Sequence, residues 1–167
     1  MCIRDSSLTH SLTHTLSISG EVSIEEKARK VSVKDVSAFL ASNKLDKYIQ
    51  AFEENEVSGD ILLDLNSSGL SELGVESALD KLRILVGFRR YLEGGGMRFS
   101  VSKLVVALSQ NNLGKYRKPF EQNGVEGDLL LHEDGELVRS MLKEIGIGSD
   151  LAITKIISKF KTFSSSR

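Results

Sequence analysis

The chain contains a long internal repeat. Residues 45–63 align with residues 113–131 without a gap, and eleven of the nineteen positions are identical. A repeat of this kind indicates two copies of one folding unit. Each copy, of about 65 residues, lies near the lower size limit for a self-sufficient core. Such a unit is too small to enclose a large active-site cavity, so we expect function to reside on surfaces.

The first residues differ from the rest of the chain. The tetrapeptide at positions 7–10, Ser-Leu-Thr-His, is repeated directly at positions 11–14. His10 and His14 have the spacing of a metal-binding pair on a helix, but low-complexity or artefactual sequence is the favoured interpretation. We therefore predict that residues 1–30 form a disordered or artefactual N-terminus, in which the mixed-charge lead-in over residues 21–30 is either a short helix extension or disordered.

The composition indicates the cellular compartment in which we expect the protein. The single cysteine, Cys2, excludes a disulfide framework. No run approaches the roughly 20 apolar residues of a membrane span, and the first residues lack the apolar core of a signal peptide. The expected location is the cytoplasm, without a membrane span.

Apolar residues recur at helical spacing through the first unit, which we place at residues 31–94. Leu79, Leu82, Leu85, Val86 and Leu92 are expected to form the inward stripe of its last helix. Ser77 is the predicted N-cap of that helix, and glycines end it. The predicted helices span 33–43, 46–55, about 61–65, the region after Ser67 and Ser68, and 77–93.

The second unit is predicted at residues 99–164, after a glycine linker at residues 95–98. Its helices are expected at 101–111, around Tyr116 and Phe120, at 129–131, at 136–145 and at 149–163. The repeat offset grows from 68 to 72 residues, which indicates one helical turn inserted near residues 134–139. Because a proline disrupts a helix interior, Pro119 predicts a late start or a kink in the second helix.

The pattern Tyr-x-x-x-Phe-x-x-x-x-Val-x-Gly-x-x-Leu-Leu, followed by Leu-Gly-Val before a long last helix, resembles the SAM (sterile alpha motif) domain. The matching residues of the first copy are Tyr48, Phe52, Val57, Gly59, Leu62, Leu63, Leu73, Gly74 and Val75. Those of the second copy are Tyr116, Phe120, Val125, Gly127, Leu130, Leu131, Ile145, Gly146 and Ile147. The resemblance implies an all-α fold of two five-helix SAM-like bundles in tandem. Both copies depart from the family's Gly-His-Arg at the start of the last helix, which is a common docking surface.

The sequence shows no catalytic machinery. His132, the only histidine in the expected folded region, is interpreted as a partly exposed residue that ends the third helix. The glycines at 94–96, and Gly146 with Gly148, lack the strand and lysine of a phosphate loop. No cysteine and histidine cluster has metal-ligand spacing. We therefore expect no enzyme activity, no cofactor and no metal.

The two units carry opposite charge. Residues 31–93 have seven basic and eleven acidic side chains, a net charge of −4, whereas residues 98–167 have eleven basic and eight acidic ones, a net charge of +3. The resemblance implies an acidic mid-loop face on the first unit, formed by Glu53, Glu54, Glu56, Asp60 and Asp64. It implies a basic end-helix face on the second unit, formed by Lys155, Lys159 and Lys161. Lys81 and Arg83 form a second-choice basic face.

These faces predict a non-catalytic scaffold or adaptor that binds other SAM domains head to tail, in the same protein or in another. A head-to-tail contact closes into a ring or propagates as a filament. Two alternatives remain: an RNA-hairpin-binding SAM protein, for which the cations are sparse, and the oligomerisation fragment of a longer signalling enzyme such as a SARM-type NAD hydrolase. Nucleic acid is not the expected partner.

Overall fold

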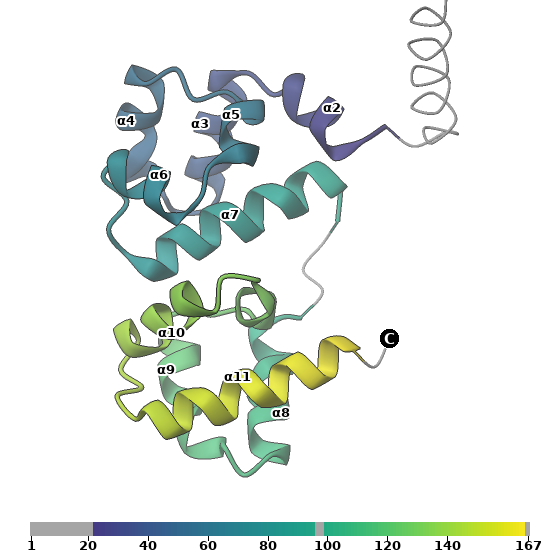
Figure 1. Cartoon of the computed structure of the whole chain (residues 1–167), viewed down its shortest axis with the longest axis vertical. Helices are drawn as coiled ribbons and strands as arrows, with labels where there is room; N and C mark the ends of the chain where they lie inside the picture. The colour runs from purple at the N-terminus through teal and green to yellow at the C-terminus, as the bar shows by residue number, and fades with distance from the viewer. Residues whose placement is uncertain (1–21, 96–98, 166–167) are drawn as a thin grey trace, which may run out of the picture.

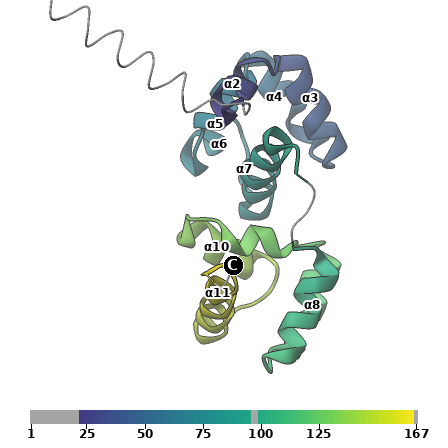
Figure 2. The same ribbon diagram turned by 90° about the vertical axis from the view of Figure 1, so that its right-hand side faces the viewer.

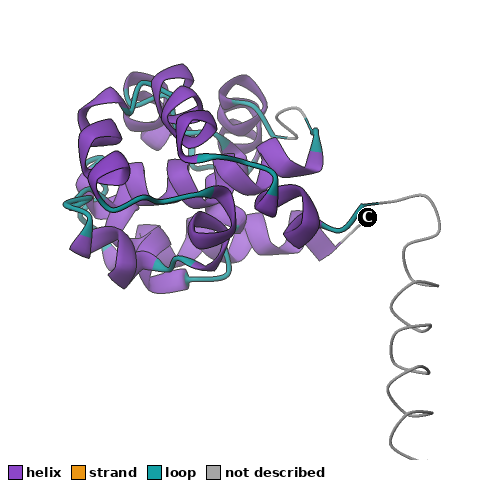
Figure 3. Ribbon diagram, turned by 90° about the horizontal axis from the view of Figure 1, so that it is seen from above, coloured by secondary structure: helices purple, strands orange, loops and turns teal. Residues whose placement is uncertain are grey.

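The computed structural model describes residues 22–95 and 99–165, and within these ranges every regular element is a helix (Figure 3). This confirms the all-helical prediction. The helices form two groups stacked along the long axis of the molecule (Figure 1). We call residues 22–95 the first half and residues 99–165 the second half.

The first half contains the predicted helices and one more. In chain order they are α2 (Ile24–Arg29), α3 (Val33–Ser42), η1 (Asp46–Tyr48), α4 (Ile49–Glu54), α5 (Gly59–Asp64), α6 (Ser67–Glu72) and α7 (Ala78–Glu93). Ser77 caps α7 as predicted, because its hydroxyl accepts the backbone N–H of Asp80 at 3.1 Å. At the other end Gly94 adopts φ 66°, the left-handed conformation that glycine tolerates at a helix end.

The folded region begins earlier than residue 31. Helix α2 is capped by Ser23 and packs against α5 and α7, and Ala28 is fully buried there. The backbone N–H of Gly59 donates to the carbonyl of Val31 at 2.9 Å. The lead-in therefore belongs to the first half. Residues 1–20, with His10 and His14, lie outside the described residues.

The second half repeats the order of elements from α3 onward. It consists of α8 (Val101–Gln110), η2 (Gly114–Tyr116), α9 (Arg117–Gln122), η3 (Gly127–Leu131), α10 (Gly135–Glu144) and α11 (Asp150–Ser165). Helix α10 has ten residues where α6 has six, so the predicted insertion of one turn lies in this helix. Of the predicted linker at 95–98, residues 96–98 lie outside the described residues.

Pro119 lies in the first turn of α9, where its missing N–H costs no helical hydrogen bond. The predicted late start is confirmed, since the helix begins at Arg117 after a separate 3₁₀ turn. The first half has the same break, between η1 and α4, without any proline. The break is therefore a property of the repeat, and Pro119 is accommodated by it.

Each half has a hydrophobic core, and α7 contributes to both. Ile84, Phe88 and Leu92 belong to the core of the first half. Ala78, Leu79 and Leu82 belong to the core of the second half. Helix α7 lies between the two groups and packs against α10 (Figures 1 and 2). Leu79 and Leu82 therefore do not form an inward stripe of the first half, because the second half covers them.

Candidate interaction surfaces

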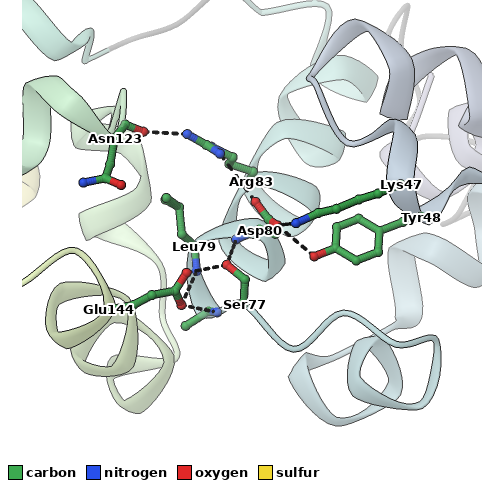
Figure 4. Close-up of polar contacts among 9 residues, drawn as sticks. Lys47, Tyr48, Ser77, Leu79, Asp80, Arg83, Asn123 and Glu144 are labelled. Carbon is green, nitrogen blue, oxygen red and sulfur yellow. Dashed lines mark hydrogen bonds and ion pairs between the residues drawn. The ribbon is translucent and has the colours of Figure 1, made fainter.

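The N-terminus of α7 is bound by a carboxylate from the other half of the molecule (Figure 4). Glu144, the last residue of α10, accepts the N–H of Ala78 at 2.7 Å and the N–H of Leu79 at 3.4 Å. It also accepts the hydroxyl of Ser77. The first N–H groups of a helix have no partner within the helix, and the helix dipole favours an anion beside them. Glu144 therefore joins the two halves at a site that suits its charge. We call the contact between α7 and the second half the junction.

Apolar side chains of α7 seal the junction. Leu79 is 6% exposed and Leu82 is fully buried, and both pack in the hydrophobic cluster of the second half. Burial of a leucine side chain stabilises by about 1.5–3 kcal/mol. The junction is therefore a packed contact as well as a polar one.

Two arginines of α7 complete the junction. The Nη2 of Arg83 donates to the backbone carbonyl of Asn123 at 2.6 Å. The Nη1 of Arg90 contacts Glu126 at 2.6 Å and Asp128 at 3.2 Å. These contacts match a basic face of the first half to acidic and carbonyl groups of the second.

A buried carboxylate supports the arginine. Asp80 accepts the Tyr48 hydroxyl at 2.8 Å, contacts the ammonium of Lys47 at 2.8 Å, and lies 3.4 Å from Arg83 (Figure 4). Burial alone would raise the pKa of Asp80, but the contacts from Lys47 and Tyr48 outweigh it and lower that pKa. Asp80 thus ties η1 to the same helix end that carries Arg83 to the second half.

The predicted acidic face is exposed. Its five residues lie at the end of α4, in the following turn and on α5; they are Glu53, Glu54, Glu56, Asp60 and Asp64. Three of them bind neighbours in the first half: Glu53 accepts Ser37, Glu54 accepts Gln50, and Asp60 accepts Ser58. The bond from Ser58 is the main reason that the pKa of Asp60 is lowered. The junction contacts described above involve none of the five.

The predicted basic residues fall in different settings. Lys155, Lys159 and Lys161 are all exposed on α11. The two second-choice residues are engaged instead. Lys81 is 9% exposed and donates to the hydroxyl of Ser71 at 2.6 Å, whereas Arg83 lies in the junction.

Sequence reasoning missed the residues of the second half that receive α7: Asn123, Glu126, Asp128 and Glu144. One signal was available. Helix α7 has apolar residues on two sides, with Leu79, Leu82 and Val86 on one and Ile84, Phe88 and Leu92 on the other. A helix with apolar residues on both sides needs two packing partners.

A cavity of about 490 Å³ opens beside the junction, with leucines of both halves and His132 among its lining residues. The ring of His132 accepts the N–H of Asp134 at 3.2 Å, and burial lowers the pKa of this histidine. Within residues 22–95 and 99–165, no group of three histidine, cysteine, aspartate or glutamate residues could hold a metal ion. His132 therefore has a structural contact at the end of η3.

No helix in the described part of the chain combines the length and the apolar character needed to cross a membrane.

The distinctive feature of this helical protein is the junction, in which the N-terminus of α7 in the first half is bound by Glu144 of the second half. Residues 29–91 match the family model of the SAM domain (Sterile alpha motif), so the first half is similar to that family. SAM domains are generally protein-interaction modules and commonly bind other SAM domains. No curated protein and no solved structure matches the chain.

Proposed function

We propose that this chain is a non-catalytic scaffold or adaptor made of two SAM domains, which assembles through head-to-tail SAM–SAM contacts. The observation that carries the proposal is the junction, in which the start of α7 is bound by the end of α10. A chain that already joins two similar units in this way has the surfaces for the same contact with other SAM domains.

The second SAM domain is supported by the repeat. The second half carries the same spacing of aromatic, glycine and leucine residues, and the order of its elements parallels that of the first from α3 to α7. Phe52 and Phe120 are both fully buried, as are Leu40 and Leu108. Equivalent positions therefore fill equivalent places in the two cores.

The direction of assembly is supported by charge. The junction uses the end-helix side of the first half and the mid-loop side of the second. The acidic face of the first half and the basic residues of α11 lie elsewhere, and they carry opposite charge. Complementary charge steers association and weakens as salt is added. Contacts of this heterologous kind generate rings or filaments of chains.

The test is the mass of the protein in solution by light scattering, over a range of concentration and at low and high salt. We expect a mass above the monomer that rises with concentration and falls with salt. Glu54→Lys combined with Asp60→Lys is expected to lower the mass without changing helical content by circular dichroism. The matched control is Glu121→Lys with Glu136→Lys, which makes the same change of charge at exposed sites of the second half.

A mass that the acidic-face variant leaves unchanged would remove that face from the proposal. A monomer at every concentration and salt would rule out self-assembly, and would leave a different SAM protein as the partner to be tested.

A further inference from the structure

The junction provides a template for a contact between chains, because the repeat gives each junction residue a counterpart. The start of α11 corresponds to the start of α7, with Ser149, Leu151 and Lys155 in the places of Ser77, Leu79 and Arg83. The corresponding receiving residues of the first half are Asn55, Asp60, Ile61 and Glu72, in the places of Asn123, Asp128, Leu129 and Glu144. We call these sets the α11 surface and the Glu72 surface.

Each of the two surfaces carries an exposed apolar side chain. Leu79 is 6% exposed in the junction, whereas Leu151 is 66% exposed, more than any other large apolar side chain in the described residues. Ile61 is 45% exposed, whereas its counterpart Leu129 is 3% exposed. Leu79 and Leu129 are thus buried in the cluster that joins α7 to the second half, whereas their counterparts Leu151 and Ile61 are exposed.

The polar groups show the same relation. Glu72 and Glu144 are both the last residues of their helices, α6 and α10. Glu144 binds a helix N-terminus, but the side chain of Glu72 is exposed and makes no hydrogen bond or ion pair with a described residue. At the start of α11, Ser149 accepts the N–H of Ala152 at 3.3 Å, much as Ser77 accepts that of Asp80. The N–H groups of Asp150 and Leu151, which follow Ser149, correspond to those of Ala78 and Leu79 that Glu144 binds at the start of α7.

We propose that a second copy of this chain places its α11 surface on the Glu72 surface. Glu72 accepts the backbone N–H groups of Asp150 and Leu151 of the second copy. The side chain of that Leu151 packs against Ile61, and Lys155 of the second copy donates to the carbonyl of Asn55. This inference rests on the proposed function and specifies the partner and the register of the contact.

The contact between copies is weaker than the junction. Thr154 stands where the junction has Leu82, Thr162 stands where it has Arg90, and Ser58 stands where it has Glu126. The second copy therefore lacks one buried leucine and the arginine that binds two carboxylates. Asp150 adds a negative charge beside Glu72. The ammonium of Lys143 lies 3.1 Å from the carboxylate of Asp150 and compensates this charge. Assembly is accordingly reversible, while the junction within each chain remains closed.

The experiment uses two variants of the full chain, Glu72→Arg and Leu151→Asp. Each removes one of the two surfaces and leaves the other intact, so each variant alone is expected to stay monomeric. An equimolar mixture is expected to form a one-to-one dimer, because the intact Glu72 surface of one variant binds the intact α11 surface of the other. Sedimentation velocity measures all three samples, and dimer formation in the mixture also shows that both variants are folded.

Two matched controls make the same chemical changes elsewhere. Glu76→Arg alters an exposed glutamate four residues beyond Glu72, and Val106→Asp alters a side chain that is 55% exposed on α8. Both controls are expected to assemble like the unaltered chain.

Three results would overturn the inference. If the unaltered chain assembles and the two variants do so equally well, the register is wrong while the proposed function stands. If each variant is monomeric and their mixture also stays monomeric, the two surfaces do not bind each other. If the unaltered chain is a monomer throughout, self-assembly fails together with the contact proposed here.

Discussion

Tyr48 and Tyr116 occupy the same position of the repeat but differ in what their hydroxyl groups bind. The hydroxyl of Tyr48 donates to Asp80, whereas the second half has Ala152 at the position of Asp80. Among the described residues, no hydrogen bond to the hydroxyl of Tyr116 is found, and Lys115 lies over its ring at 5.0 Å. Comparing the two tyrosines therefore separates the contribution of the hydrogen bond to stability from that of the aromatic ring.

Tyr48→Phe is expected to reduce the free energy of unfolding of the first half by about 1.5–3 kcal/mol, the range for a hydrogen bond to a charged group. Urea unfolding, followed by circular dichroism, measures the change. Tyr116→Phe is the matched control and is expected to have little effect. Equal losses in the two variants would show that the bond to Asp80 contributes nothing.

His132 gives the stability of the protein a dependence on pH. Burial lowers the pKa of His132 below its ordinary value of 6.5, so the unfolded chain binds the proton more readily than the folded chain. The stabilisation that neutral His132 gives the folded protein is complete above pH 6.5 and is lost as the pH falls toward the pKa of the folded state. For one proton, the free energy of unfolding falls by no more than about 1.4 kcal/mol per pH unit. His132→Asn, which keeps an oxygen to accept the N–H of Asp134, is expected to flatten this part of the curve. Urea unfolding between pH 7 and pH 5 would contradict this if the variant and the parent had the same slope.

At the scale of elements, the repeat and the apolar spacing predicted nearly every helix. The turn added to α10 followed from the change in repeat offset. The late start at Pro119 was predicted from the chemistry of proline, but the first half has the same break without a proline. For α2 the sequence left both a short helix extension and disorder open, because its six residues expose charge and bury only Ala28. The junction was missed for a different reason. The pattern shows that Leu79 and Leu82 are buried, but it does not show which half of the molecule buries them.

Helix α7 is the element on which the junction depends, so we expect Leu82→Ala to loosen it. Loss of a fully buried leucine costs about 2–5 kcal/mol, here from the contact between the halves. Small-angle X-ray scattering is expected to show a larger radius of gyration, with helical content retained. Thr154→Ala, the equivalent change on the exposed face of α11, is the control. An unchanged radius in Leu82→Ala would show that the polar contacts alone hold the halves together.

At the scale of the whole molecule, the two halves depend on each other unequally. The second half draws Ala78, Leu79 and Leu82 from the chain of the first, whereas the core of the first half includes no residue of the second. Loss of the first half therefore removes part of the second core. Loss of the second half uncovers α7 but leaves the first core intact.

Two equivalent substitutions test this asymmetry. Leu62→Asp and Leu130→Asp each bury a carboxylate at a position that is 1% exposed, which costs several kcal/mol and unfolds the half that contains it. In amide NMR spectra, Leu62→Asp is also expected to shift and broaden signals of the second half. Leu130→Asp is expected to leave the signals of the first half sharp outside the start of α7. The same effect in both directions would show that the cores are shared equally.

The short stretch of chain that follows α7 has a further consequence. Only five residues, 94–98, separate the end of α7 at Glu93 from Phe99 in the second half. A short connection holds two binding surfaces at an effective concentration on the order of millimolar. A contact with a dissociation constant in the micromolar range would then be closed almost all the time, however dilute the protein. The junction is thus independent of how much protein is present, and only the contacts between chains respond to its abundance.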